Sequence, residues 1–320
     1  MSMDSVQAIA ARLRENIGKV IVGRDDTVNL LLTAMLSQGH VLLEDVPGTG
    51  KTMLAKAMAK SLSLSFKRIQ FTPDLLPSDI TGMSIFDQKA VEFRFQPGPV
   101  FANIVLADEI NRATPRSQSA LLESMEERQV TVDGQTYPLE LPFLVIATQN
   151  PIETQGTFPL PEAQLDRFFI KTKMGYPSTE EGMAVLNRFI SDNPLDTLAP
   201  VASTQDILTA QKAVTQVKVA ADVQRYIVQI VELTRVAEAV ILGVSPRGSL
   251  ALMRAAQAWA AISGRHFVQP DDVKAVARAV LSHRIICRSS FGGAGRASEE
   301  VVEKVLLQVP VPTEAAEEDQ

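Results

Sequence analysis

A glycine-rich turn within residues 41–62 constrains the fold of this chain more than any other feature of its sequence. The segment VLLEDVPGTGKTMLAKAMAKSL joins an apolar strand to a helix. Glycines in such a turn let backbone N–H groups converge on phosphate oxygens, and the positive end of the helix dipole favours an anion at the same place. The candidate binding residues are Pro47, Gly48, Thr49, Gly50, Lys51, Thr52 and Met53.

Two side chains of this turn favour a phosphate site over a simple helix start. Lys51 would supply a positive charge, and Thr52 would offer a hydroxyl to Mg²⁺. A turn that merely begins a helix would leave both residue types unexplained. One departure weakens the signal without removing it: the general pattern GxxxxGK, followed by Ser or Thr, has a glycine where this chain has Asp45.

Short apolar runs alternate with helical patterns in the first half of the chain. The alternation predicts an α/β fold with a parallel sheet and helices on both of its faces. The predicted strands are residues 40–45, 66–71, 103–108, 142–148 and 167–173.

The strand signal disappears beyond residue 176. Ser178 and Glu181 form a capping box there, which predicts the first of several helices. The final segment combines prolines with an acidic run and has no apolar period. We therefore expect a nucleotide-binding α/β domain at 1–176, a helical domain at 177–309 and a disordered acidic tail at 310–320.

Two adjacent acids follow the predicted strand at 103–108. Because ligands of such folds bind at the carboxyl edge of the sheet, Asp108 and Glu109 are expected beside the phosphates. Asp108 would hold Mg²⁺ through its water shell, and Glu109 would orient and polarise an attacking water. The alternative is a solvated strand end that carries two acids.

Later signals support the same plan. Asn150 ends the next predicted strand, where it could hydrogen-bond the phosphate or the water, although asparagine before proline is also an ordinary turn residue. Thr114 and Pro115 predict a helix start. Asp133 and Gly134 predict a hairpin turn.

Composition argues against several classes of protein. The formal net charge of −6 and the aromatic content of 5% provide neither a basic footprint nor a stacking platform for nucleic acid. Charges interrupt the N-terminal helical pattern and the apolar stretch near residue 235, so we expect a cytoplasmic protein without membrane insertion.

The metal-binding residue types are sparse. His40, His266 and His283 lack metal-ligand spacing, and Cys287 is expected to be a small buried hydrophobe. We expect no metal beyond Mg²⁺.

Taken together, these motifs resemble the MoxR family within the AAA+ superfamily of ATPases. The segments that carry the resemblance are VIVGRDD, LLEDVPGTGKT, GPVFANIVLADEINRATPRSQSALLESMEE, IATQNP, PLPEAQLDRF and SPRGSL. The resemblance implies an AAA+ P-loop NTPase sheet sandwiched by helices, followed by a smaller all-α lid domain. It also implies hydrolysis of ATP with Mg²⁺.

The resemblance further implies roles for single residues. Asn150 would be the sensor-1 residue, Arg167 the arginine finger and Arg247 the sensor-2 arginine. The backbone around Val22 and Gly23 would line the adenine pocket. The segment VIVGRDD could instead be an ordinary apolar turn, and Arg167 could form a salt bridge that anchors the last strand of the sheet.

An arginine finger reaches the nucleotide of a neighbouring subunit, so the resemblance implies a homo-oligomeric ring, predicted to be a hexamer. The implied work is remodelling or maturation of a client protein, with a partner that contains a von Willebrand factor A domain. The inserted segment 72–102 resembles a family hairpin that faces the pore or the client. Arg112 and Arg116 could contact a neighbouring subunit, or lie at a solvated helix start.

Three alternatives remain open at this point. The first is a motor subunit like that of magnesium chelatase, which shares the core architecture. The second is a nucleotide-gated binding module with little turnover, against which Glu109 and Arg167 argue. The third is a nucleic acid motor, against which the net acidity argues.

Overall fold

The computed structural model describes residues 2–151, 156–190, 192–288 and 294–312 and divides the chain into two compact units. One unit is Ala8–Gln211, and the other comprises Met1–Gln7 and Lys212–Gln320. The boundary between the units falls after Gln211, about two helices later in the chain than the boundary expected at residue 176.

Polar contacts explain why residues 177–211 group with the α/β unit. The Asn16 side chain donates hydrogen bonds to Ser61 Oγ (3.0 Å) and to the carbonyl of Ala199 (2.9 Å). The Gln211 side chain donates to the carbonyl of Met35 at 2.7 Å. Because buried polar groups require partners, these contacts fix the segment to helices of the α/β unit.

The sheet of the α/β unit matches the prediction. All five strands are parallel and lie in the order β2-β5-β8-β1-β9. Their bounds are β1 Val41–Glu44, β2 Phe66–Gln70, β5 Ile104–Asp108, β8 Leu144–Gln149 and β9 Ile170–Thr172.

Both faces of this sheet are covered, as their sequences require. Leu42, Val105 and Val145 belong to the main hydrophobic cluster, which includes Leu121 and Leu122 from the helix after the acidic pair. The alternate strand residues are buried as well, and these are Val41, Ile104 and Ile146. Successive side chains of a strand point to opposite faces of the sheet, so strands that are apolar at every position must be covered on both faces.

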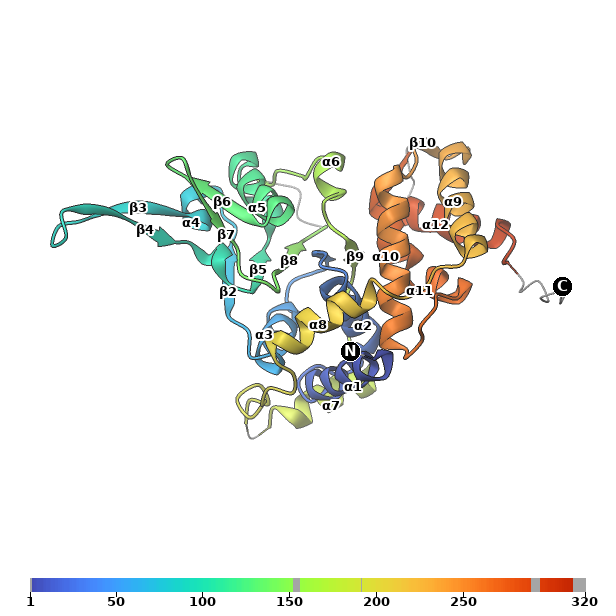
Figure 1. The fold of residues 1–320 in the computed structure, drawn as a ribbon, viewed down its shortest axis with the longest axis horizontal. Coiled ribbons are helices and arrows are strands. Elements are labelled where there is room, and N and C mark those ends of the chain that lie inside the picture. The colour runs from blue at the N-terminus through green and yellow to red at the C-terminus, as the bar shows by residue number, and fades with distance from the viewer. Residues whose placement is uncertain (1, 152–155, 191, 289–293, 313–320) are drawn as a thin grey trace. The chain divides into compact units, whose positions relative to one another are not determined.

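Two helices of this unit begin at the starts that the sequence predicts, and Figure 1 shows all of its helices. Pro115 is the first residue of α5, and Ser178 caps α7 through the Glu181 N–H at 3.2 Å. The helices are α1 Met3–Gly18, α2 Asp25–Leu36, α3 Lys51–Ser61, α4 Pro77–Thr81, α5 Pro115–Glu127, α6 Glu162–Leu165, α7 Thr179–Arg188 and α8 Thr204–Val214.

Two hairpins extend from the α/β unit. The inserted segment forms β3 (Gly82–Asp87) and β4 (Glu92–Pro97), which project well away from the sheet in Figure 1. The second hairpin, β6 (Gln129–Val132) and β7 (Gln135–Pro138), turns at Asp133 and Gly134. Both turn residues have positive φ, as a type I′ turn requires.

The second unit contains α9 (Ala221–Val236), α10 (Pro246–Ile262), α11 (Pro270–Leu281) and α12 (Ala294–Gln308). It departs from the all-helical prediction by a short antiparallel pair, β10 (Val240–Leu242) with β11 (Ile286–Cys287).

Three further sequence expectations meet the structure here. Cys287 is partly exposed and not fully buried, although burial still raises the pKa of its thiol. Residues 313–320 of the expected acidic tail lie outside the described residues. Within the part of the chain that the structure describes, no helix is both long enough and apolar enough to span a membrane.

His40 is a buried structural residue that joins three elements. The backbone N–H of Val145 in β8 donates to His40 Nδ1 at 3.0 Å, so Nε2 carries the proton and faces the carbonyl of Met125 in α5 at 3.1 Å. Burial lowers the pKa of His40 from 6.5 to about 4. The folded protein therefore holds this imidazole neutral.

We predict that His40 lowers the free energy of unfolding of the protein in mild acid. Below pH 6.5 the unfolded chain binds a proton at His40 that the folded chain does not, so unfolding becomes easier until the pH reaches about 4. The contribution at pH 5 is about 2 kcal/mol relative to pH 7.5. Urea unfolding at both pH values should show a smaller pH dependence in His40→Gln than in the wild type. The exposed His266→Gln serves as the control, and an equal pH dependence in all three proteins would contradict the prediction.

Candidate functional site

The turn between β1 and α3 has the conformation expected of a phosphate-binding loop. Gly48 and Gly50 have φ values of 85° and 90°, a region that residues with a side chain rarely adopt. Gly50 is also the N-cap of α3, so the orphan N–H groups of the first helical turn point into the loop. The Lys51 ammonium donates to the carbonyls of Asp45 (2.9 Å) and Val46 (3.0 Å), which places its charge beside the loop.

Asp45 has a clear structural purpose at the position where the general pattern has glycine. Its Oδ1 accepts the N–H of Val46 at 2.8 Å, and its Oδ2 accepts those of Met174 (2.9 Å) and Gly175 (2.8 Å). The side chain is buried. Asp45 therefore fixes the start of the loop to the residues that follow β9, which a glycine could not do.

Thr148 in β8 organises the acidic pair. Its hydroxyl donates to Asp108 Oδ1 at 2.6 Å and accepts the N–H of Glu109 at 2.8 Å. Glu109 has a positive φ of 57°, which is uncommon for a residue with a side chain. The buried Thr148 hydroxyl thus orients the Asp108 carboxylate and helps to hold the backbone conformation of Glu109.

The two carboxylates also have cationic and amide partners. Arg68 Nη2 lies 2.6 Å from Asp108 Oδ2, and Gln70 Nε2 donates to Glu109 Oε2 at 2.8 Å. Arg112 Nε lies 3.2 Å from the same Glu109 oxygen. Arg112 thus contacts its own chain here, while its predicted contact with a neighbouring subunit stays a prediction. These partners offset the repulsion between two adjacent negative charges.

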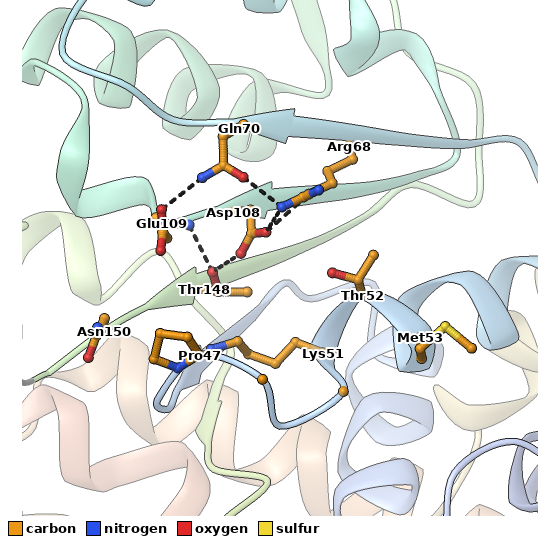
Figure 2. A pocket seen from close by; sticks show the side chains of 12 residues that line it. Pro47, Lys51, Thr52, Met53, Arg68, Gln70, Asp108, Glu109, Thr148 and Asn150 are labelled. Atoms are coloured by element: carbon orange, nitrogen blue, oxygen red, sulfur yellow. Dashed lines mark hydrogen bonds and ion pairs between the residues drawn. The ribbon is translucent and has the colours of Figure 1, made fainter. Parts of the chain in front are cut away.

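These elements together line one pocket at the carboxyl edge of the sheet (Figure 2). The pocket brings most of the predicted phosphate, magnesium and water-binding residues together with three that the sequence did not indicate, Arg68, Gln70 and Thr148. Its full lining is Pro47, Gly48, Gly50, Lys51, Thr52, Met53, Arg68, Gln70, Asp108, Glu109, Thr148 and Asn150.

The pocket fits magnesium bound with a nucleotide. Thr52 and Asp108 present the hard oxygen ligands that Mg²⁺ prefers. Among the described residues, no group of three or more His, Cys, Asp or Glu side chains could hold a metal ion alone. A metal here would therefore depend on phosphate oxygens and water for its remaining ligands, as Mg²⁺ commonly does.

Some predicted residues lie outside this pocket. Gly23 lines a second cavity of the same unit, together with residues 24–27 and 172–174, whereas Val22 and Thr49 line neither. Arg167 forms an ion pair with Glu126 of α5 at 3.1 Å and does not line the pocket of its own chain. Arg247 lies in the first turn of α10 in the other unit, directly after the N-cap Ser245 and Pro246.

Comparisons with known proteins agree with this geometry. Residues 40–170 match a family model described as the ATPase family associated with various cellular activities (AAA). Residues 232–305 match a model described as the AAA lid domain. The chain resembles the solved structure of a Cytophaga hutchinsonii protein proposed to be an ATPase, with a TM-score of 0.89 and 39% identity over 97% of this chain and 98% of that one.

Three relatives match over nearly the full length. YeaC of Bacillus subtilis, an uncharacterised protein, is 50% identical over 97% of both chains. The chaperone MoxR1 of Mycobacterium tuberculosis is 43% identical over 92% of this chain and 80% of its own. The protein MoxR of Paracoccus denitrificans is 32% identical over 92% of this chain and 93% of its own.

We predict that Asp45→Ala destabilises the α/β unit. Three backbone N–H groups would lose a buried acceptor, which costs about 3 kcal/mol. Urea unfolding followed by circular dichroism measures the change. Asp45→Asn retains one acceptor oxygen and should fall between the wild type and the alanine variant. Asp133→Asn, in an exposed hairpin turn that tolerates asparagine, is the matched control, and a loss in Asp45→Ala no larger than in this control would refute the role of Asp45.

Proposed function

The chain belongs to the MoxR family of AAA+ ATPases, and we propose that it hydrolyses ATP with Mg²⁺ in the pocket at the carboxyl edge of its sheet. One observation carries the proposal: the loop with Lys51 and the acidic pair Asp108 and Glu109 line a single pocket. That arrangement places anion-binding groups beside a metal ligand and a candidate for activating water.

Each side chain then has a distinct task. The N–H groups of the loop and the Lys51 charge bind the β- and γ-phosphates, while Thr52 and Asp108 hold Mg²⁺, in part through water. The metal, when bound, neutralises charge on the phosphates. Glu109 orients and polarises the attacking water, and Asn150, which lines the same pocket, hydrogen-bonds that water or the terminal phosphate.

Three further roles are part of the same proposal. Arg247 stabilises phosphate charge from the first turn of α10 and couples nucleotide state to the second unit. The cavity that Gly23 lines receives the base of the nucleotide. The backbone of Val22, which precedes Gly23 in the sequence, is proposed to border the same base. Met53 and Pro47 border the phosphate end.

We propose that Arg167 acts on the nucleotide of a neighbouring copy in a homo-oligomeric ring, predicted to be a hexamer. Arg167 is outside the pocket of its own chain, and about a third of its side chain is exposed. Its guanidinium could therefore exchange the Glu126 carboxylate for a phosphate with little loss, since partly exposed ion pairs are weak. Hydrolysis would then require assembly.

The proposed work is remodelling or maturation of a client protein. The β3–β4 hairpin supports this role because its outer half exposes apolar side chains, with Phe86 51% and Phe93 73% exposed. The two rings contact each other edge to face at 5.3 Å. Exposed aromatic groups bind other proteins well. A partner with a von Willebrand factor A domain is proposed from the family alone.

Two inactive variants provide the test of a shared site. Glu109→Gln should lower ATP turnover by about a hundredfold or more while nucleotide still binds. Arg167→Ala should do the same, and an equal mixture of the two variants should recover part of the wild-type rate. Recovery requires an intact Glu109 in one subunit to meet an intact Arg167 from its neighbour. The measurement is steady-state phosphate release.

The Glu126→Gln variant is the matched control for Arg167. It breaks the observed ion pair but keeps the guanidinium, so its turnover should stay near the wild-type rate. If Glu126→Gln is as inactive as Arg167→Ala, the ion pair itself matters and the finger role fails. If the mixture stays inert although its subunits exchange, Arg167 does not act across an interface. A wild-type protein without turnover would refute the ATPase proposal.

The hairpin role has a separate test. Phe93→Ser should leave basal ATP turnover within about twofold, because the side chain does not line the pocket and is exposed on a hairpin. It should weaken capture of a labelled, permanently unfolded test polypeptide. Leu307→Ser, which removes an 87% exposed leucine from α12, is the control for loss of any apolar surface group. Equal losses in both variants would show that the hairpin has no special role.

A further inference from the structure

Strand β2 supplies two polar side chains to the pocket that the proposed mechanism does not use. Arg68 and Gln70 are two residues apart, so they lie on the same face of the strand. Parallel pairing with β5 places Gln70 opposite Asp108. Arg68 Nη2 donates to Gln70 Oε1 at 2.7 Å, and Figure 2 shows both side chains directed toward the acidic pair.

Arg68 engages one particular oxygen of Asp108. Its Nη2 and Nε lie 2.6 and 3.1 Å from Asp108 Oδ2. The other oxygen, Oδ1, accepts the Thr148 hydroxyl. Both carboxylate oxygens are thus occupied by this chain's own donors, and the Arg68 guanidinium already neutralises the carboxylate on which Mg²⁺ binding would depend.

We propose that Arg68 has two alternative partners in this pocket, the Asp108 carboxylate, where it competes with Mg²⁺, and the terminal phosphate of ATP. On binding of Mg²⁺ and ATP, Arg68 leaves Asp108 and binds the terminal phosphate. This inference rests on the proposed ATPase function, because it assigns Arg68 a partner in the same pocket.

Electrostatics favour the exchange. A guanidinium on Asp108 Oδ2 would repel Mg²⁺ bound to the same carboxylate, whether directly or through a water molecule. Asp108 keeps its orientation when Arg68 leaves, because Thr148 still holds Oδ1. The departing guanidinium then needs another anion, and arginine binds phosphate through paired N–H groups.

The position of Arg68 selects the terminal phosphate. Lys51 and the N–H groups of the loop lie on the β1 side of the pocket, so they contact the β-phosphate and only one side of the terminal phosphate. Arg68 lies on the β2 side, beside Asp108 and in contact with Gln70, which itself contacts Glu109. The water that Glu109 is proposed to activate attacks the terminal phosphate. Arg68 is therefore adjacent to the place where that phosphate must lie.

The exchange is easy because the present ion pair is weak. The Arg68 side chain is 47% exposed, and the side chain of Asp108 is 13% exposed. Ion pairs with one solvated partner contribute little stability. Arginine also has several rotatable bonds, so its guanidinium can move while its backbone stays in β2.

Nucleotide binding to Arg68→Gln separates the two parts of the proposal. The probes are ADP and the slowly hydrolysed analogue ATPγS, each titrated calorimetrically into the full chain. In excess Mg²⁺, affinity for ATPγS should fall about tenfold, while affinity for ADP should change by less than about twofold, because only ATPγS has the terminal phosphate. The Mg²⁺ concentration that gives half-maximal enhancement of ADP binding should fall about threefold, because the competing cation is gone.

Two further variants control the experiment. Arg68→Lys keeps the charge but loses the paired donors, so its ATPγS affinity should lie between those of the wild type and Arg68→Gln. Arg94→Gln removes an exposed arginine that pairs with Glu92 on the β3–β4 hairpin, and it should bind both nucleotides as the wild type does. Thermal unfolding by circular dichroism confirms that each variant is folded.

Several results would overturn the proposal. Equal losses of ADP and ATPγS affinity in Arg68→Gln would mean that Arg68 shapes the pocket without contacting the terminal phosphate. An unchanged Mg²⁺ requirement would mean that it does not compete at Asp108. A wild-type protein that binds and hydrolyses ATP, with an Arg68→Gln variant indistinguishable from it, would refute this inference alone. A wild-type protein that binds no ATP would refute the proposed function instead.

Discussion

The parallel pairing of β1, β5 and β8 is the constraint on which the candidate site depends. Each strand delivers its functional residues at its carboxyl end, and parallel register brings those ends to one edge of the sheet. The phosphate loop, the acidic pair and Asn150 come from three separate parts of the sequence. Apolar burial on both faces keeps the strands in register, because a shift by one residue would exchange the two faces.

Local patterns were sufficient to predict much of this architecture. The loop around Lys51 combines glycines, a cation and a hydroxyl within a few residues, and the Asp133-Gly134 pair between alternating segments strongly favours a hairpin. The strand positions follow from short apolar runs between helical periods. The fold and most residues of the pocket could therefore be predicted without knowledge of any long-range contact.

The residues that the sequence did not reveal act through contacts between distant segments. Arg68 and Thr148 look like ordinary strand residues until the register places them beside Asp108. Asp45 looked like a defect in a pattern, and its purpose depends on N–H groups 129 and 130 positions later. The domain boundary differed for the same reason, because polar contacts such as that of Gln211 with Met35 group α7 and most of α8 with the α/β unit.

Asp45 and Arg24 hold the same residue, Gly175, from two different parts of the α/β unit. Asp45 binds the N–H of Gly175, while Arg24 binds the carbonyl of Gly175 at 3.3 Å and the carboxylate of Glu181 at 3.0 Å. One residue after β9 is thus held from both sides, by the phosphate loop and by the wall of the cavity at Gly23. The phosphate loop and the cavity that is proposed to receive the base are thus tied to each other through Gly175. A movement of the loop would therefore be transmitted to that cavity through the backbone after β9.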